Sequence, residues 1–285
     1  MRRTLAEKNH HLKRIVADSK SAVVAFSGGV DSTFLLAVCA DVLAGRVLAV
    51  TAESEIMPRH ELVQAGELTR RLGVAHVIVE SNDLDIDGFA DNPPDRCYLC
   101  KKERFAKIRQ IAVKRGFVSV FDGSNIDDLD DFRPGMKAVR ELGIRSPLAA
   151  AGLGKADIRT LSKSLGLTTW DQPAAACLAS RIPYDTRITR SILEQIENAE
   201  AFLRQQGMRV FRVRHHDDIA RLELGEEEMR QLFENQLQDR IRHYFLTLGY
   251  RYIVMDLGGY RTGSLNEVLP ESTLQRSHDS VDIIE

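Results

Sequence analysis

The sequence predicts an α/β protein, in which a parallel sheet with helices on both faces is followed by a smaller C-terminal α+β domain. Short apolar runs alternate with helical patterns through the first part of the chain, as in strand–helix–strand units. A glycine-rich turn joins the first apolar run directly to a helix. Later the order changes to helix, two short strands, helix and strand. We therefore expect domains over residues 1–170 and 190–285, joined by a connecting segment over 171–189.

The composition is that of a globular protein. Of the 285 residues, 44% are hydrophobic and 28% are charged, which suits one large domain or two modest ones. The net charge of −2 gives no sign of a broad nucleic-acid surface. The chain lacks a signal-peptide pattern and any apolar stretch long enough to cross a membrane. We expect a cytoplasmic protein that binds neither nucleic acid nor membrane.

The strands of the first domain are short runs rich in valine, isoleucine and alanine, and its helices begin at turn residues. Pro58 lies near the first turn of one helix, and Gly154 opens another. The expected elements are, in chain order, a helix over 4–19, a strand over 22–26, a helix over 33–43, a strand over 46–51, a helix over 58–72, a strand over 76–80, a helix over 98–115, a strand over 117–121, and helices over 135–142 and 155–165.

Ligands of parallel sheets bind at the carboxyl ends of the strands. Residues that follow the expected strands are 27–29, 51–53, 81–82 and 122–125. Asn125 is a nucleotide-binding candidate on this rim. The acidic residues Asp127, Asp128 and Asp131 continue the same loop and could serve Mg²⁺ near a triphosphate. An acidic, solvated loop explains them equally well.

Residues 168–190 show no clean period and are interrupted by Pro173 and Pro183, which is typical of a connecting active-site segment. The pattern after it predicts a small α+β domain. Its expected elements are a helix over 190–206, strands over 209–214 and 219–224, a helix over 226–248 and a strand over 252–257.

The turn Ser-Gly-Gly-Val-Asp-Ser (27–32) is the strongest chemical signal. A strand, a glycine turn and a helix start together aim backbone N–H groups and a helix dipole at one point, which favours a phosphate. An ordinary glycine turn is the alternative. The residues expected to bind nucleotide are Ser27, Gly28, Gly29, Asp31 and Ser32, with Asp31 also a candidate Mg²⁺ contact.

The four cysteines divide into three groups. Cys97 and Cys100 stand at i and i+3 where a helix begins, beside basic residues, which favours thiolates on one helix face. Such a pair holds zinc or an iron–sulfur cluster, forms a redox pair, or simply lacks a partner. Cys177 lies among small residues that give access to its sulfur, although a buried, inert thiol is the alternative. Cys39 falls on an apolar helix and is expected in the core.

Arginines cluster in the second half of the chain. Ser180 and Arg181 bring a hydroxyl and a guanidinium to the Cys177 loop, and a guanidinium suits a phosphate or carboxylate. Arg212 and Arg214 alternate on one strand and share a face. Arg261 could join them around a second phosphate, although surface arginines are the alternative. The neighbours His215 and His216 point to opposite faces, so we do not expect a metal pair.

The turn over 27–32 resembles the PP-loop of ATP pyrophosphatases, which correspond to the adenine nucleotide alpha hydrolase-like fold. Further motifs resemble the LarE family of pyridinium-3,5-biscarboxylic acid mononucleotide sulfurtransferases, and they span nearly the whole chain. These motifs are Asn-Pro-Pro-Asp-Arg-Cys-Tyr-Leu-Cys-Lys (92–101), Asp-Gly-Ser-Asn-Ile-Asp-Asp (122–128), Arg-Pro-Gly (133–135), Cys-Leu-Ala-Ser-Arg (177–181) and Leu-Gly-Gly-Tyr-Arg-Thr-Gly-Ser-Leu-Asn (257–266).

The resemblance implies that ATP with Mg²⁺ adenylates a carboxylate of the pyridinium mononucleotide, and that sulfur at Cys177 displaces AMP. The thiocarboxylate product serves nickel-pincer cofactor biosynthesis. Some members of the family sacrifice the cysteine sulfur, and others hold a 4Fe–4S cluster on three cysteines. Cys97, Cys100 and Cys177 fit the second pattern, in which three thiolates leave one iron open.

The resemblance also implies metal or substrate contacts at Glu200 and Asp256, and it makes Glu200 a candidate Mg²⁺ ligand. Solvated carboxylates are the alternative. Asp185 stands where the family pattern has glycine. A homo-oligomer and other nickel-pincer cofactor biosynthesis proteins are the expected partners.

Three rival functions fit less of the sequence. A tRNA thiolation enzyme also combines a PP-loop with cysteines, but it needs a basic surface for the RNA backbone. An ammonia-dependent amidating enzyme has no need of Cys177. A module that only senses ATP leaves three cysteines and the arginine-bearing loop unexplained.

Overall fold

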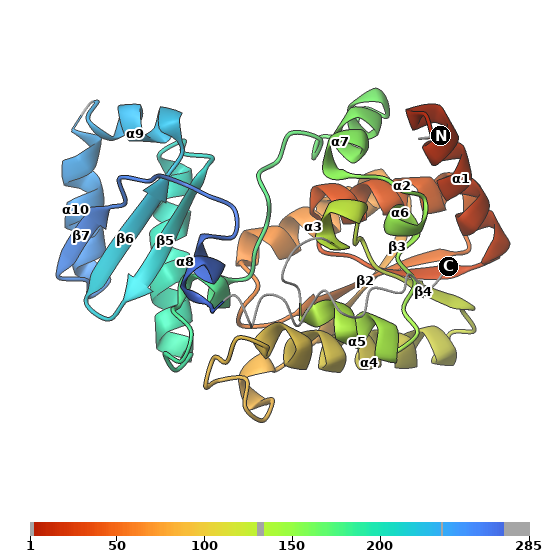
Figure 1. Ribbon diagram of the computed structural model, residues 1–285, viewed down its shortest axis with the longest axis horizontal. Helices are drawn as coiled ribbons and strands as arrows, with labels where there is room; N and C mark the ends of the chain where they lie inside the picture. Colours follow the sequence, from red (N-terminus) through yellow and green to blue (C-terminus); the bar gives the residue numbers. More distant parts are fainter. Residues whose placement is uncertain (1–2, 130–133, 235, 271–285) are drawn as a thin grey trace. The chain divides into compact units, whose positions relative to one another are not determined.

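The structure is a computed structural model, and it describes residues 3–129, 134–234 and 236–270 (Figure 1). The described chain divides into two compact units. The N-terminal unit takes the residues up to Asn82 together with Asp95–Ala174. The C-terminal unit consists of Asp83–Pro94 and Ala175–Leu269. The short segment Asp83–Pro94, which precedes Cys97 and Cys100, therefore packs with the later part of the chain.

The N-terminal unit contains a four-stranded sheet in which all the strands are parallel, and this confirms the expected fold class. The strand order is β3 (Ala75–Glu80), β2 (Val47–Glu53), β1 (Ala22–Ala25) and β4 (Ser119–Phe121). The two central strands are almost entirely buried, as strands covered on both faces must be.

Helices cover both faces of this sheet, as Figure 1 shows. One core lies beneath α1 (Leu5–Asp18), α2 (Val30–Leu43), α3 (Arg59–Arg71), α6 (Pro147–Ala150) and α7 (Lys155–Ser164). A second core lies beneath α4 (Arg96–Lys114) and α5 (Gly135–Glu141). Helix α2 is apolar on most of its surface because it is buried on most sides, with Phe34, Leu35 and Leu36 fully enclosed.

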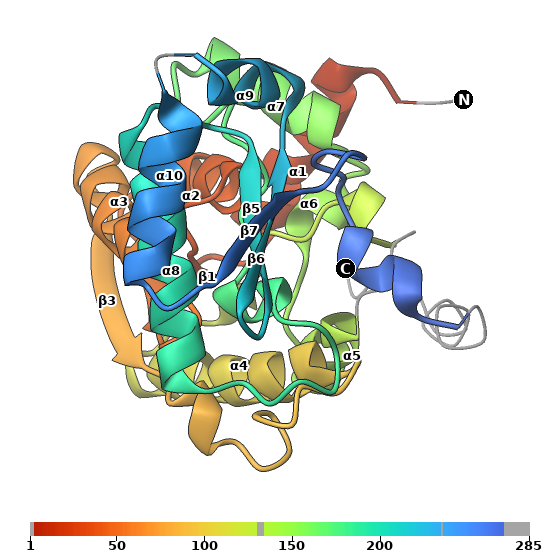
Figure 2. The ribbon, with the colours of Figure 1, turned by 90° about the vertical axis from the view of Figure 1, so that its left-hand side faces the viewer.

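The C-terminal unit is the smaller α+β unit that the sequence predicts. Strands β5 (Phe211–His216) and β6 (Ile219–Leu224) are antiparallel, and β7 (Tyr252–Met255) pairs in parallel with β6 at the edge. Figure 2 shows α10 (Leu237–Thr247) running beside α8 (Arg190–Gln205). The two helices meet through stacked rings of Phe202 and Tyr244, whose centroids are 4.2 Å apart.

The structure corrects several of the expected elements. The single helix expected over 226–248 is two helices, α9 (Glu226–Leu232) and α10, because α9 packs on β6 whereas α10 packs on β7. Gln236, in the left-handed conformation, caps the second helix. The strand expected over 209–214 begins at Phe211 and ends at His216. Helix α6 was not expected, although proline stands at its first turn.

Within the described residues, no helix combines the length and the apolar character needed to cross a bilayer.

Candidate functional site

The turn after β1 forms a compact loop at the carboxyl end of the sheet. Gly28 has a φ of +76°, which glycine adopts without strain, and Gly29 caps α2. Two hydroxyls organise the loop. The Ser27 Oγ accepts a hydrogen bond from the Gly29 N–H at 3.3 Å and lies 3.1 Å from the Ser32 Oγ. The first N–H groups of α2 therefore lie beside two hydroxyls, and backbone N–H groups at a helix start suit an anion.

A second loop, which follows β4, lies against the first. At Gly123 an added Cβ would come within 3.1 Å of the Ser32 backbone nitrogen, so glycine eases this close approach of the two loops. The buried carboxylate of Asp122 accepts hydrogen bonds from the hydroxyls of Ser124 and Ser146. Asn125 is also buried, and its side-chain oxygen accepts from the Asp127 N–H at 2.9 Å. Asn125 thus braces the loop beside the candidate nucleotide site.

Asp31 forms an ion pair with a lysine of another helix in this region. Its Oδ2 atom is 2.5 Å from Nζ of Lys155, the first residue of α7. Its Oδ1 atom is buried and lacks a hydrogen-bond partner within the described ranges. Asp127 accepts from the backbone N–H of Lys155 at 2.7 Å. The sequence analysis did not identify Lys155 as a candidate residue. Asp131, which it did name, lies outside the described residues.

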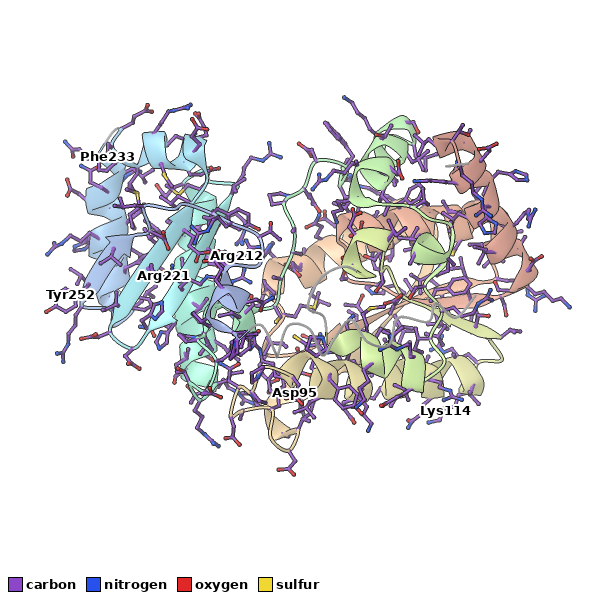
Figure 3. All side chains as sticks on the ribbon, viewed as in Figure 1. Asp95, Lys114, Arg212, Arg221, Phe233 and Tyr252 are labelled. Carbon is purple, nitrogen blue, oxygen red and sulfur yellow. The ribbon has the colours of Figure 1, made fainter. Side chains whose placement is uncertain are left out.

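The cysteine pair lies in the first turn of α4. Cys97 is exposed and Cys100 is buried. Asp95 occupies the expected cap position without a side-chain capping bond, and Figure 3 labels it at one end of α4 with Lys114 at the other. Cys39, in contrast, is fully buried on α2, and burial raises the pKa of its thiol. The core position expected for Cys39 is confirmed.

Cys177 caps a short 3-10 turn, Leu178–Arg181, and its carbonyl oxygen organises that turn. The oxygen accepts hydrogen bonds from the Ser180 N–H, the Ser180 hydroxyl and Nη1 of Arg181, at 3.0, 2.7 and 2.9 Å. Three hydrogen bonds therefore hold the backbone of Cys177, whose side chain is partly exposed.

Arg181 is itself held from within the unit. Its Nε and Nη2 atoms each donate to a carboxylate oxygen of Glu200 at 2.9 Å, and both side chains are 3% exposed. Burial alone would raise the pKa of Glu200, but the charge and hydrogen bonds of Arg181 hold it below its usual value. This geometry favours a structural role for Arg181, in which it holds the Cys177 turn, over the expected role as a ligand of the substrate. It likewise favours Glu200 as its counter-ion over a Mg²⁺ contact.

The face of the sheet opposite the helices is rich in arginine. Arg214 donates to the Ser180 carbonyl at 2.5 Å and to Glu223 at 2.8 Å, and its buried Nε atom has no hydrogen-bond partner within the described ranges. Arg212 lies over the ring of Tyr260, and its pKa is lowered by burial and then by the charge of Arg181. Figure 3 labels Arg212 and, on the next strand, Arg221.

Acidic partners neutralise only part of this charge. Arg221 pairs with Glu223 and Asp256, which gives Asp256 a structural partner. Arg261 pairs with Glu267 near the surface. Among the described residues of this face, the arginines outnumber the carboxylates. This arginine face consists of Arg212, Arg214 and Arg221 with the carboxylates Glu223 and Asp256.

The two histidines of β5 lie on opposite faces. His215 is buried beside the Tyr250 ring, and Nε2 of His216 accepts from Arg221. Across the described parts of the chain, no group of three or more His, Cys, Asp or Glu side chains is arranged to hold a metal ion.

The candidate nucleotide residues and the Cys97–Cys100 pair belong to the N-terminal unit. Cys177 and the arginine face belong to the C-terminal unit.

A parallel sheet with this serine–glycine loop ahead of α2 defines the N-terminal unit as a PP-loop domain. The sequence profile of the NAD synthase family, a PP-loop family, matches residues 5–110. A protein of Lactiplantibacillus plantarum named pyridinium-3,5-bisthiocarboxylic acid mononucleotide synthase is 39% identical, over 95% of this chain and 98% of its own.

Two further relatives are uncharacterized proteins. One, from Synechocystis, is 38% identical over 93% of this chain and 99% of its own. The other, from Methanocaldococcus jannaschii, is 30% identical over 86% of this chain and 92% of its own. The chain belongs to the LarE family of PP-loop proteins.

Proposed function

We propose that this chain is an ATP-dependent sulfurtransferase. It adenylates a carboxylate of pyridinium-3,5-biscarboxylic acid mononucleotide and converts it to a thiocarboxylate for nickel-pincer cofactor biosynthesis. The observation that carries the proposal is the pairing, in one chain, of a PP-loop with a Cys177 turn whose carbonyl is fixed by three donors. The name of the Lactiplantibacillus plantarum relative supports the choice of substrate.

The N-terminal unit would bind ATP with its phosphates at the PP-loop. Mg²⁺ fits beside it because Asp31 offers a carboxylate oxygen with no hydrogen-bond partner among the described residues, and Mg²⁺ takes one or two carboxylates together with phosphate oxygens. A substrate carboxylate oxygen attacks the α-phosphorus. The bond from that phosphorus to the bridging oxygen breaks, and pyrophosphate leaves with the electron pair.

The C-terminal unit would hold the anionic substrate. A mononucleotide with two carboxylates carries several negative charges, and the arginine face presents an excess of positive charge. Arg212 and Arg214, with Ser180 and Arg261 beside them, are the proposed ligands of its phosphate and carboxylates. Arg181 fixes the Cys177 turn next to them.

The sulfur step replaces the C–O bond of the acyl adenylate by a C–S bond, and AMP leaves with the bonding electrons. Cys177, Cys97 and Cys100 are the proposed ligands of a 4Fe–4S cluster, which would supply a sulfide for transfer. Three thiolates suit such a cluster, and two of them already stand at i and i+3 in one helix turn. Sacrifice of the Cys177 sulfur is the alternative source.

A homo-oligomer remains part of the proposal. The edge strand β7 exposes Tyr252 and Val254, and Leu257 just beyond it is 89% exposed, so an apolar strip is left at the sheet edge. A second copy of the chain would cover it.

The test is anaerobic turnover of the purified protein with ATP, Mg²⁺ and the mononucleotide. Pyrophosphate and AMP should form together with a product in which sulfur replaces one carboxylate oxygen, detected by mass spectrometry. Asp31→Ala and Ser32→Ala should abolish pyrophosphate release, because both residues belong to the PP-loop. Pyrophosphate release retained by both variants would rule out this ATP site.

A further inference from the structure

His76 is a partly buried histidine of the edge strand β3 that the proposed function leaves unused. Its Nε2 atom lies 2.8 Å from Oγ1 of Thr51, a buried residue of the neighbouring strand β2. Its ring also meets the ring of Phe26 edge to face, with the centroids 6.2 Å apart. Phe26 directly precedes the PP-loop, so His76 and Thr51 lie beside the residue from which that loop begins.

The directions of these hydrogen bonds follow from the hydroxyl group of Thr51. The hydroxyl has one proton, and it lies 2.7 Å from the carbonyl oxygen of Phe26, which can only accept. The proton therefore belongs to the bond with Phe26, and the hydroxyl oxygen accepts from His76. Burial lowers the pKa of His76, so its ring is neutral near pH 7 and has one proton. The contact with Thr51 requires that this proton be on Nε2.

The two bonds in series determine how the first peptide group of the PP-loop is oriented. The carbonyl oxygen and the following N–H of a planar trans peptide point in opposite directions. Because the Phe26 carbonyl is directed at Thr51, the N–H of Ser27 points the other way. There it meets the Ser32 Oγ, which lies 3.4 Å from the Ser27 nitrogen. Thr51 thus directs the Ser27 N–H into the loop.

We propose that His76 is a positioning residue for the ATP site, which acts through Thr51 to aim the Ser27 N–H at a phosphate oxygen. The inference rests on the proposed ATP site. The bond from Ser27 to Ser32 is long, since about 2.9–3.0 Å is usual for N–H···O, and a charged phosphate oxygen is the stronger acceptor. Hydrogen bonds in series also polarise one another, so donation by His76 strengthens the hold on the Phe26 carbonyl.

Calorimetric titration with Mg²⁺-ATP and Mg²⁺-pyrophosphate tests this role without any turnover. His76→Phe keeps a ring beside Phe26 but lacks the donor, and Thr51→Val keeps the branched shape but lacks the hydroxyl. Each variant should bind both ligands about threefold to tenfold more weakly, the loss expected for one neutral hydrogen bond. His76→Gln restores an N–H donor and should recover most of the affinity. Ile78→Val, at a half-exposed position of the same strand, is the matched control and should bind like wild type.

A double variant shows whether His76 acts through Thr51. Once Thr51→Val has removed the hydroxyl, adding His76→Phe should weaken binding no further, because the series of bonds is already broken. Losses that simply add would overturn the inference. Nitrogen-15 NMR of the His76 ring is a second readout, which a role in packing alone would not determine. The wild-type ring should have its proton on Nε2, and a neutral ring protonated at Nδ1 would also overturn the inference.

The outcomes separate the two proposals. If wild-type protein binds neither ATP nor pyrophosphate, the proposed ATP site is wrong and the role of His76 falls with it. If wild type binds both ligands and His76→Phe binds them equally well, only the inference about His76 is overturned. Thermal unfolding of each variant confirms that the compared proteins are folded.

Discussion

The side-chain amide of Asn92 donates a hydrogen bond of 2.6 Å to the carbonyl oxygen of Pro183. Asn92 is fully buried and lies in the segment that leads into the Cys97–Cys100 helix, whereas Pro183 follows the Cys177 turn. The backbone adds a second bond, from the Asp185 N–H to the Asn92 carbonyl at 3.1 Å. Both bonds lie within the C-terminal unit, where they join the segment that precedes α4 to the segment that follows the Cys177 turn.

We predict that Asn92→Gly lowers the free energy of unfolding by about 1–3 kcal/mol, because the Pro183 carbonyl loses its partner in a buried setting. Asn92 has a φ of +60°, so glycine keeps the backbone unstrained and isolates the side-chain effect. Urea unfolding measures the change. Asn92→Ala should cost more, since alanine adds backbone strain. Equal stability of wild type and Asn92→Gly would show that this bond is of no consequence.

We predict a larger loss of unfolding free energy when the buried Arg181–Glu200 ion pair is broken. Glu200→Gln leaves the guanidinium buried without its counter-charge, and breaking one side of such a pair costs about 3–5 kcal/mol. The Cys177 turn should loosen at the same time, because Arg181 holds its carbonyl. Denaturant unfolding and the rate of Cys177 alkylation are the measurements. Glu194→Gln, an exposed change on the same helix, is the control and should be neutral. A Glu200→Gln protein as stable as this control would contradict the prediction.

The same pair predicts an acid sensitivity. The pKa of Glu200 is lower in the folded protein than its usual 4.5, so the folded state binds the proton more weakly than the unfolded chain. This stabilisation is present above pH 4.5 and is lost as the pH falls through the lowered value. The difference in unfolding free energy between wild type and Glu200→Gln should therefore shrink on acidification below that pH. A difference that stays constant would contradict the assignment.

The sequence predicts local features well and distant pairs poorly. The strand, glycine turn and helix over 22–43 are visible because neighbouring residues specify them. The partners of Asp31 and Arg181 lie on other elements, and nothing in the local pattern marks Lys155 or Glu200 as the matching charge. The break before α10 was missed for a similar reason, since it depends on which strand each helix covers.

The backbone conformation of Asp185 explains why the resemblance to the LarE family leads us to expect glycine at this position. The residue has a φ of +63°, in the left-handed region that favours glycine. We predict that Asp185→Gly is more stable than Asp185→Ala by about 1 kcal/mol, because alanine pays the steric cost of this conformation. Urea unfolding of the two variants measures it. Identical midpoints would mean that the turn relaxes to another conformation.

The sulfur chemistry gives the most decisive prediction. If Cys97, Cys100 and Cys177 ligate a 4Fe–4S cluster, the anaerobically reconstituted protein should show broad brown absorption with iron and sulfide in matching amounts. Each of the three Cys→Ala variants should lose this absorption. Cys39→Ala is the matched control, since that thiol is fully buried in the core and should be dispensable.

Intact mass after turnover distinguishes the two sulfur sources. With a cluster as the source, Cys177 is only a ligand and the protein should keep all its cysteine sulfur through repeated cycles. With a sacrificed cysteine, one sulfur is lost per chain, dehydroalanine appears at position 177 and activity stops after a single turnover. Because the Cys97–Cys100 pair would have no part in that reaction, full activity of Cys97→Ala and Cys100→Ala together with dehydroalanine would reject the cluster and leave the PP-loop assignment intact.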